Sequence, residues 1–280
     1  MSNKLNPWIN ANGKFVHPKA PSGGGGPGGF TYHGSLGCNI DLHSSIPHPQ
    51  SPAARCLALD EKQKAIFLAY NADGHQYLSM KAIEAAHKGL PASLLWIRHF
   101  LSDTPTSTVY RDMTDVWALA HWRAKTQKHH FMRANNQREK DAYRENIEWI
   151  QQNAHKALYN LRRVWKEHLG NYDPLFVNEP LGDAFHALQD SFSLGHVNRE
   201  KRGDIYVITA IHVYDKTNKE THSELDQQWE SPLGKEAIIA CRELTKIVIL
   251  SALQKLDSAF KQKWTSLWST FEGMFLATTI

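Results

Sequence analysis

The segment at residues 185–196, FHALQDSFSLGH, constrains the fold more than any other part of the chain. His186 and Asp190 are four residues apart, so on a helix they lie on one face, one turn apart, where a single metal ion can bridge them. Large apolar residues flank the pair, which predicts a helix packed into a core. His196 follows Gly195, where we expect the helix to end and the chain to turn this imidazole back toward the pair.

Histidine is abundant and cysteine is not, which favours a metal site made from nitrogen and oxygen ligands. The 280 residues include 16 histidines, and imidazole is the commonest metal-binding side chain. Cys38, Cys56 and Cys241 are widely spaced and form no C-x-x-C pair, which argues against a cysteine-based zinc site and a disulfide framework. The net charge of +4 lacks the dense basic footprint of a dedicated nucleic-acid binder.

Apolar periodicity predicts a mainly α fold, a helical bundle that encloses the metal site. A first helix is expected to begin near Asp60, and Ser231 with Pro232 forms a good cap and first turn for the last helix. One strand is expected at residues 205–214, which are rich in Ile, Val, Tyr and Thr. The other predicted helices lie at 76–87, 91–102, 108–124, 137–168, 180–193 and 233–270.

Composition divides the chain into a tail and a domain. Residues 1–58 are rich in Pro, Gly, Ser and His and contain the run GGGGPGG at 23–29, so they have too little apolar content for a core of their own. We therefore predict a flexible tail or adaptor at 1–58 and a folded domain at 59–280. No apolar run resembles a signal peptide or a membrane span, so we expect synthesis in the cytoplasm without a signal peptide.

A second pair with ligand spacing follows the first one. His222 and Asp226 are also four residues apart and can bind one ion if this segment is helical. Glu224 is a poorer candidate because at two residues from His222 it points to another face of the helix. The spacing alone is weak, since such pairs occur by chance, but its order after His196 adds weight to it.

These motifs resemble the zinc-dependent phospholipase C family, which includes the bacterial phosphatidylcholine-cleaving enzymes and clostridial alpha-toxin, and the related fungal single-strand-specific nucleases. In that superfamily H-x3-D-x5-H is followed by H-x3-E or H-x3-D, and is preceded by an Asp and a His about a dozen residues apart. The resemblance covers roughly residues 60–270. It consists of short motifs in the right order, and the tail has no counterpart.

The resemblance implies further ligands upstream. Asp115 and His130 match the earlier Asp and His, because His130 directly precedes an aromatic residue as the family's histidine does. His129 and Asp112 stay open as alternatives, and His121 is read as an ordinary helix residue. His75 matches the first metal histidine of the family.

Family enzymes also use the amino group and carbonyl of an N-terminal Trp as ligands, and no Trp stands just before His75. This difference leaves three alternatives for the third metal site: it is absent, it is completed by Asp73 or His43, or it is created by proteolysis near Ala72. By analogy, the first ion would bind Asp115, His130, His186 and one oxygen of Asp190. The second would bind His196, His222 and Asp226. The third would bind His75 and the other oxygen of Asp190.

The resemblance implies a phosphodiesterase with two or three zinc ions, in which Asp115 also acts as the base toward water. Phospholipid is the leading substrate, and tryptophans could form a membrane-facing rim, although core packing explains most of them as well: Trp96, Trp117, Trp229, Trp264 and Trp268. The alternative is a single-strand nuclease, favoured by Asp226 where phospholipases commonly carry Glu and by three basic residues for a groove: Arg199, Lys201 and Arg202. A third hypothesis is a non-catalytic, metal-binding helical bundle.

A phosphodiesterase of this kind is hazardous to the cell that makes it. We therefore expect an antibacterial effector, exported by a contact-dependent machine of the type VI kind, with the tail at 1–58 as its adaptor. The expected partners are a phospholipid membrane, the secretion machinery and an immunity protein. The plain alternative is an intracellular housekeeping hydrolase.

Overall fold

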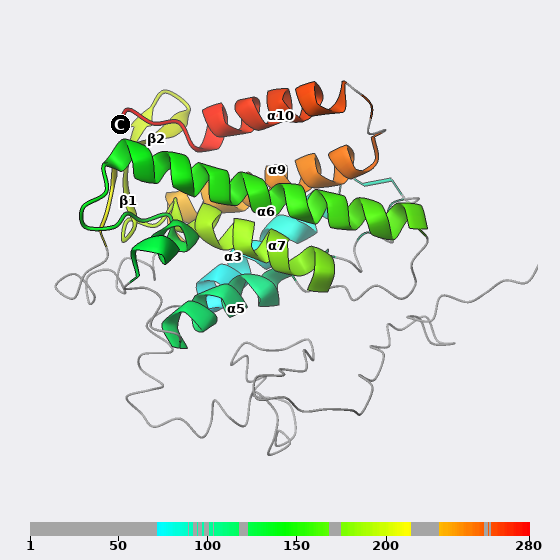
Figure 1. The fold of residues 1–280 in the computed structure, drawn as a ribbon, viewed down its shortest axis with the longest axis horizontal. Coiled ribbons are helices and arrows are strands. Elements are labelled where there is room, and N and C mark those ends of the chain that lie inside the picture. The colour runs from blue at the N-terminus through cyan, green and yellow to red at the C-terminus, as the bar shows by residue number, and fades with distance from the viewer. Residues whose placement is uncertain are drawn as a thin grey trace, which may run out of the picture.

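The computed structural model describes residues 72–88, 90–91, 94, 97, 101–102, 104–117, 123–167, 175–213, 230–254, 257 and 259–280. Within these ranges helices dominate, and one pair of strands completes the structure (Figure 1). The prediction of a mainly α fold with a short β segment is therefore confirmed. The predicted tail at 1–58, the helix near Asp60 and most of the helix at 91–102 lie outside the described residues.

Helix α7 (Leu175–Asp190), which carries the first histidine and aspartate of the central motif, lies in the middle of the helical part. Figure 1 shows the long helix α6 above it and α5 below it. Because neighbours cover it on several sides, its apolar side chains are buried together with the polar ones. The helices that contact α7 are α3 (Ala72–His87), α5 (Thr104–Trp117), α6 (Glu139–Glu167) and α9 (Pro232–Ala252).

The predicted start of α7 was wrong by one and a half turns. We expected the helix to begin at Pro180, but the structure begins it at Leu175 and keeps the proline inside. A proline near the start of a helix removes only one backbone hydrogen bond, so packing against the neighbouring helices outweighs this loss. At its other end α7 stops at Asp190, three residues earlier than predicted, and continues in tight turns.

Helix α5 lies very close to α7. A Cβ added at Gly182 would lie 2.7 Å from the carbonyl carbon of Ser107, so only glycine allows this approach. Two polar contacts hold the same pair of helices: Thr104 donates to Asn178 Oδ1 at 2.6 Å, and Arg111 donates two hydrogen bonds to Asp183 at 2.6 and 2.8 Å. These contacts follow the same order along both helices, so α5 and α7 run parallel.

The predicted strand is half of a hairpin. Strand β2 (Ile205–Ile211) matches it, but it pairs with β1 (Val197–Arg202), which we did not predict. The sequence of β1, VNREKR, has no apolar alternation, so it carries no strand signal. The two-residue turn explains the pairing, because Gly203 adopts a φ of 62°, as the turns of tight hairpins require.

The last predicted helix, at 233–270, is two helices in the structure. Helix α9 begins as predicted, with Pro232 in its first turn and the Ser231 hydroxyl accepting from the Gly234 amide. It ends at Ala252, where the buried guanidinium of Arg162 donates to the Ala252 carbonyl. Helix α10 (Phe260–Phe275) then packs against α9, which buries a face of four aromatic residues that a continuous helix would leave in water: Trp264, Trp268, Phe271 and Phe275.

The hairpin, the end of α7 and the end of α10 are joined by one arginine. Arg199 donates to the carbonyls of Ser191, Tyr206 and Phe275 at 2.6, 2.8 and 3.0 Å. Its guanidinium also lies 3.9 Å from the centre of the Phe192 ring. Burial lowers the pKa of Arg199 to about 9, which leaves it charged at neutral pH. This side chain therefore stabilises the turn that follows the metal motif.

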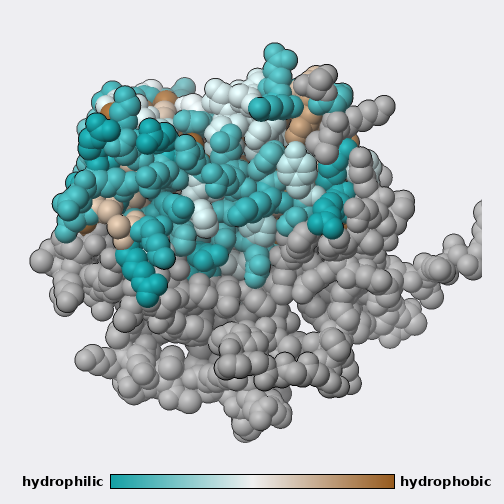
Figure 2. Space-filling view, viewed as in Figure 1, coloured by the Kyte–Doolittle hydropathy of each residue, from teal (hydrophilic) through white to brown (hydrophobic). Residues whose placement is uncertain are grey.

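The face of the molecule seen in Figure 2 is mainly hydrophilic over α6 and α10, with small, separate apolar areas. Few large apolar side chains in the described part are exposed, and they belong to several helices: Met80, Tyr159, Trp165, Leu250, Leu267 and Met274. Among the helices that the structure describes, none has both the length and the apolar content to cross a membrane.

Candidate metal centre

Five of the predicted ligands come together around the carboxylate of Asp190, in the interior of the helical part. His186 and Asp190 are 0% and 2% exposed, and His75 is 14% exposed. The five residues come from α3, from the 3-10 helix η3 (Ala124–His130), from α7 and from the turns after it. The cluster thus joins four segments that are far apart in the sequence: His75, His130, His186, Asp190 and His196.

One oxygen of Asp190 faces two histidines. His186 Nε2 and His130 Nδ1 lie 3.1 and 3.4 Å from Asp190 Oδ2, and the two nitrogens are 3.0 Å apart. Ligands of a tetrahedral zinc ion at about 2.0–2.1 Å would be about 3.3 Å from one another, so the three atoms are spaced as zinc ligands are. Oδ2 is buried and accepts no hydrogen bond in the described part of the chain. A buried carboxylate oxygen in this state fits a cation.

The other oxygen faces two more histidines. His75 Nε2 lies 3.3 Å and His196 Nε2 lies 3.7 Å from Asp190 Oδ1. His75, His186 and Asp190 form a group whose ligand atoms all lie within 4.8 Å of one another, and this group could hold a metal ion. The carboxylate therefore separates two pairs of imidazoles, one at each oxygen.

The end of α7 brings His196 into the cluster. After Asp190, the amides of Phe192 and Ser193 bond to the carbonyls three residues earlier, which reverses the chain within a few residues. The His196 ring then donates from Nδ1 to the backbone carbonyl of His130. Because a carbonyl can only accept, the neutral ring carries its proton on Nδ1, which leaves the lone pair of Nε2 facing Asp190.

The structure also separates His130 from its neighbour. His129 stacks on Trp149 with ring centres 4.3 Å apart, and the ammonium of Lys128 lies 5.1 Å from the same ring. His130 instead contacts Asp190 and His186, and η3 ends directly after it at Phe131, whose backbone is left-handed with a φ of 50°. Of the two adjacent histidines, it is therefore His130 that joins the cluster.

The structure does not describe the side chains of the remaining predicted site residues. Asp115 and Asp112 belong to helix α5, but their side chains are not described. The side chain of Asp73, which precedes His75 in α3, is not described either. Four candidates fall entirely outside the described residues, and their roles stay predictions: His222, Asp226, Glu224 and His43. His121, which the sequence analysis reads as an ordinary helix residue, lies outside them as well.

Sequence reasoning missed Gln189, which is buried beside the cluster. Its carboxamide oxygen lies 2.7 Å from His75 Nδ1, and its nitrogen donates to Ser79 at 2.8 Å. No motif or spacing pointed to it, because an amide beside Asp190 is an ordinary residue in a helix. Only the approach of α3 to α7 reveals its contact with a candidate ligand.

The electrostatics of the cluster suit a cation. Burial works against ionisation of Asp190, but the positive charge that His196, His186 and His75 carry when protonated outweighs it and holds the pKa of this carboxyl well below its usual range. Burial lowers the pKa of His186, although Asp190 partly offsets the effect. An ionised carboxylate beside a neutral imidazole is the protonation state that metal binding requires.

The metal-free protein is expected to lose stability as the pH falls from about 7 toward 5. In the unfolded chain His186 regains its usual pKa of about 6.5, whereas burial lowers that pKa in the folded state. Below about pH 6.5 the unfolded chain binds a proton at His186 that the folded protein does not bind, so the free energy of unfolding decreases. Asp190 contributes its own loss only at far lower pH, since its folded pKa is lowered.

Thermal unfolding with a chelator present, recorded at several pH values, measures this effect. Burial also lowers the pKa of His155, which lies against Trp264, so a His155→Gln variant separates its contribution from that of His186. A melting temperature that rises on acidification would contradict the prediction, because it would mean that the folded cluster takes up the proton.

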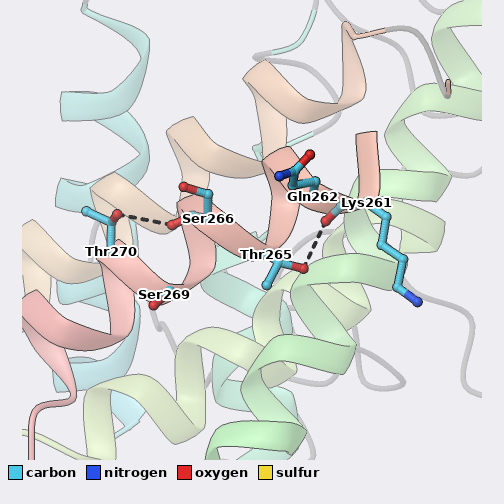
Figure 3. Close-up of a pocket in the computed structure, with 6 residues that line it drawn as sticks. All are labelled: Lys261, Gln262, Thr265, Ser266, Ser269 and Thr270. Carbon is cyan, nitrogen blue, oxygen red and sulfur yellow. Dashed lines mark hydrogen bonds between the residues drawn. The ribbon is translucent and has the colours of Figure 1, made fainter. Parts of the chain in front are cut away.

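The polar side of α10 carries a surface pocket that is separate from the cluster. A surface pocket of about 650 Å³ runs along this helix, and Figure 3 shows its six lining residues, Lys261, Gln262, Thr265, Ser266, Ser269 and Thr270. Two of the hydroxyls donate to the helix's own carbonyls, Thr265 to Lys261 and Thr270 to Ser266. No residue of the histidine cluster lines this pocket.

The chain was compared with protein-family models, with curated proteins and with solved structures, and none of these comparisons gave a match. The resemblance to the zinc-dependent phospholipase C family therefore rests on the order of the short motifs alone. The structure supports a coarser statement, that His75, His186 and Asp190 could hold a metal ion.

Proposed function

We propose that this protein is a zinc-dependent phosphodiesterase. The observation that carries the proposal is the carboxylate of Asp190, which has two imidazole nitrogens within 3.4 Å of one oxygen and two within 3.7 Å of the other. A carboxylate approached on both sides suits a bridging ligand between two cations. Such an arrangement is common to hydrolases that act on phosphate esters with paired metal ions.

Zinc is the ion that these donors favour. Imidazole nitrogen with carboxylate oxygen matches its borderline character, and ligand sets without cysteine leave positions open for water and substrate. Bound zinc would supply Lewis acidity toward a phosphoryl oxygen and a water that ionises near neutral pH. The protein's own part is to hold the imidazoles neutral, keep Asp190 ionised and exclude bulk water from the buried side.

We assign the ligands of two ions from these contacts. His130, His186 and Asp190 Oδ2 would hold one ion, with Asp115 of α5 as a further ligand and as the base toward water. His75, His196 and Asp190 Oδ1 face the second position. As the resemblance implies, His222 and Asp226 would bind the same ion as His196. That ion would be either the one at this second position or a third ion.

We propose phospholipid as the substrate class. The contacts that the basic residues after the metal motif make within the protein support this choice. Arg199 is engaged with three carbonyls, and Arg202 pairs with Glu200 at 3.2 Å on the surface. Lys201 lies over the ring of Tyr206, 5.9 Å from its centre. These are the residues that would line a groove for single-stranded nucleic acid, so their other contacts weaken the nuclease alternative.

Two of the tryptophans considered for a membrane-facing rim do not serve there. Trp264 and Trp268 are buried in the face of α10 that packs on the helical part. The side chains of the other three, Trp96, Trp117 and Trp229, lie outside the described residues. Trp264 and Trp268 therefore cannot contribute to the proposed rim.

The test is hydrolysis by the full-length protein loaded with zinc. Vesicles of phosphatidylcholine and phosphatidylethanolamine are expected to release diacylglycerol and a phosphorylated headgroup, and chelation is expected to stop the reaction. Single-stranded DNA and RNA, assayed in parallel, are expected to be cleaved far more slowly. Chelator-sensitive cleavage of nucleic acid with intact lipid would select the nuclease. Bound zinc without hydrolysis of any substrate would select the non-catalytic metal-binding bundle.

A further inference from the structure

A row of buried polar side chains leads from helix α5 to the ligand His75. Gln189, Ser79 and Thr108 are all at most 3% exposed, so water does not reach them. Gln189 Nε2 lies 2.8 Å from Ser79 Oγ, and Ser79 Oγ lies 3.0 Å from Thr108 Oγ1. The row ends at a backbone carbonyl, that of Thr104, 2.8 Å from Thr108 Oγ1.

This carbonyl fixes the direction of every hydrogen bond in the row. A carbonyl only accepts, so Thr108 donates its single proton to Thr104 and must accept from Ser79. Ser79 has then used its own proton and must accept from Gln189. The amino group of the carboxamide therefore points to Ser79, and its oxygen points to His75.

The direction of the row decides the protonation of the His75 ring. The carboxamide oxygen of Gln189 lies 2.7 Å from His75 Nδ1 and can only accept, so the ring proton is on Nδ1. In the neutral ring Nε2 then carries the lone pair, and it lies 3.3 Å from Asp190 Oδ1. Two lone pairs facing each other at this distance in a buried site repel, and a cation shared between them removes the repulsion.

We propose that Gln189, Ser79 and Thr108 are positioning residues that hold His75 in the Nδ1–H form and so make its Nε2 a ligand for a divalent cation. The proposal rests on the proposed metal centre and adds to it the residues that prepare one of its ligands. Partners of this kind fix the orientation and tautomer of metal-binding histidines, and their loss weakens metal binding by about 10–100-fold.

The sharpest test changes Thr108, the residue most distant from the ligand. In a Thr108→Val variant, Ser79 loses its acceptor and is free to donate to the oxygen of Gln189 instead. The amide then turns over, its amino group donates to His75 Nδ1, and the ring proton moves to Nε2. This proton points at Asp190 and blocks the metal, so a substitution without any contact with the ligands is expected to change the tautomer.

Two variants serve as controls. Thr108→Ser keeps the hydroxyl and is expected to behave like the natural protein. Thr245→Val removes a hydroxyl of the same kind from α9, where Thr245 is buried and donates to the Cys241 carbonyl at 2.8 Å. It lies outside the row, so it reports the effect of losing a buried threonine hydroxyl on stability alone.

Two measurements are made on the full chain: the nitrogen-15 NMR shifts of the His75 ring without metal, and zinc affinity by competition with a chromophoric chelator. We expect Nδ1–H in the natural protein, Nε2–H in Thr108→Val, and zinc affinity lower by about 10–100-fold in that variant only. An Nε2–H ring in the natural protein overturns the inference, even if Thr108→Val does not fold. Unchanged affinity and tautomer in the folded Thr108→Val variant also overturn it.

The outcome for the proposed function is separate. If the natural protein shows Nδ1–H but binds zinc without hydrolysing any phosphodiester, the phosphodiesterase proposal fails and the positioning of His75 holds. If it hydrolyses phosphodiesters and Thr108→Val binds zinc as tightly as the natural protein, the positioning fails and the function holds.

Discussion

Asp190→Asn is expected to release the metal and to abolish phosphodiester hydrolysis. Both oxygens of the carboxylate face imidazole nitrogens, so the change removes the ligand oxygen from one side of the cluster and leaves only a neutral amide oxygen on the other. An amide also places a donating amino group where one of these oxygens was, and it removes the negative charge that offsets the charge of the cations. Zinc affinity is expected to fall by at least about 100-fold.

Elemental analysis and thermal unfolding with and without a chelator measure this effect. Metal that binds only the folded state adds to its stability, so chelation should lower the melting temperature of the natural protein and leave that of Asp190→Asn unchanged. Asp183→Asn is the matched control on the same helix, because Asp183 pairs with Arg111 and not with the histidines. Full metal content in Asp190→Asn would remove this residue from the metal centre.

Gly182→Ala is expected to destabilise the protein by about 3 kcal/mol, since overpacking a tight contact typically costs about 1–3 kcal/mol and this one involves backbone. The new methyl carbon would lie 2.7 Å from the carbonyl carbon of Ser107 and 2.8 Å from the amide nitrogen of Thr108. Neither atom can move away unless α5 separates from α7. The separation would also disturb Thr108 and the backbone that carries Asp115, so metal affinity should decrease as well.

Denaturant unfolding of the metal-free protein measures the change in stability. Gly273→Ala, in the exposed side of α10, is the matched control, because an added Cβ meets nothing within 4 Å. There the gain in helix propensity should stabilise the protein by about 0.5–1 kcal/mol. Equal effects of the two substitutions would contradict the close approach of α5 to α7.

The sequence predicted local features well where one signal was strong. The cap at Ser231, with Pro232 behind it, was confirmed because a side chain within three residues of its partner needs no tertiary contact. Strand β1 was missed, since its polar residues carry no periodic signal and its pairing depends on the turn at Gly203. The break between α9 and α10 was missed because burial of the aromatic face, which is a tertiary effect, decides it.

By itself, the sequence determined that His186 and Asp190 lie together in the site. His186 and Asp190 share a helix face because they are one turn apart, and this geometry follows from the helix alone. The tertiary structure decided which other residues join them. His75, His130 and His196 reach Asp190 only because α3, η3 and the turns after α7 pack around that helix.

The same distinction explains Gln189, Ser79 and Thr108. Each is an ordinary polar residue in its own helix, and nothing in its neighbourhood along the chain marks it. Their connection arises where α3, α5 and α7 meet and exclude water, so that each donor must find its acceptor within the protein. Spacing along one helix is a property of the sequence, whereas the contact of side chains from three helices is a property of the folded core.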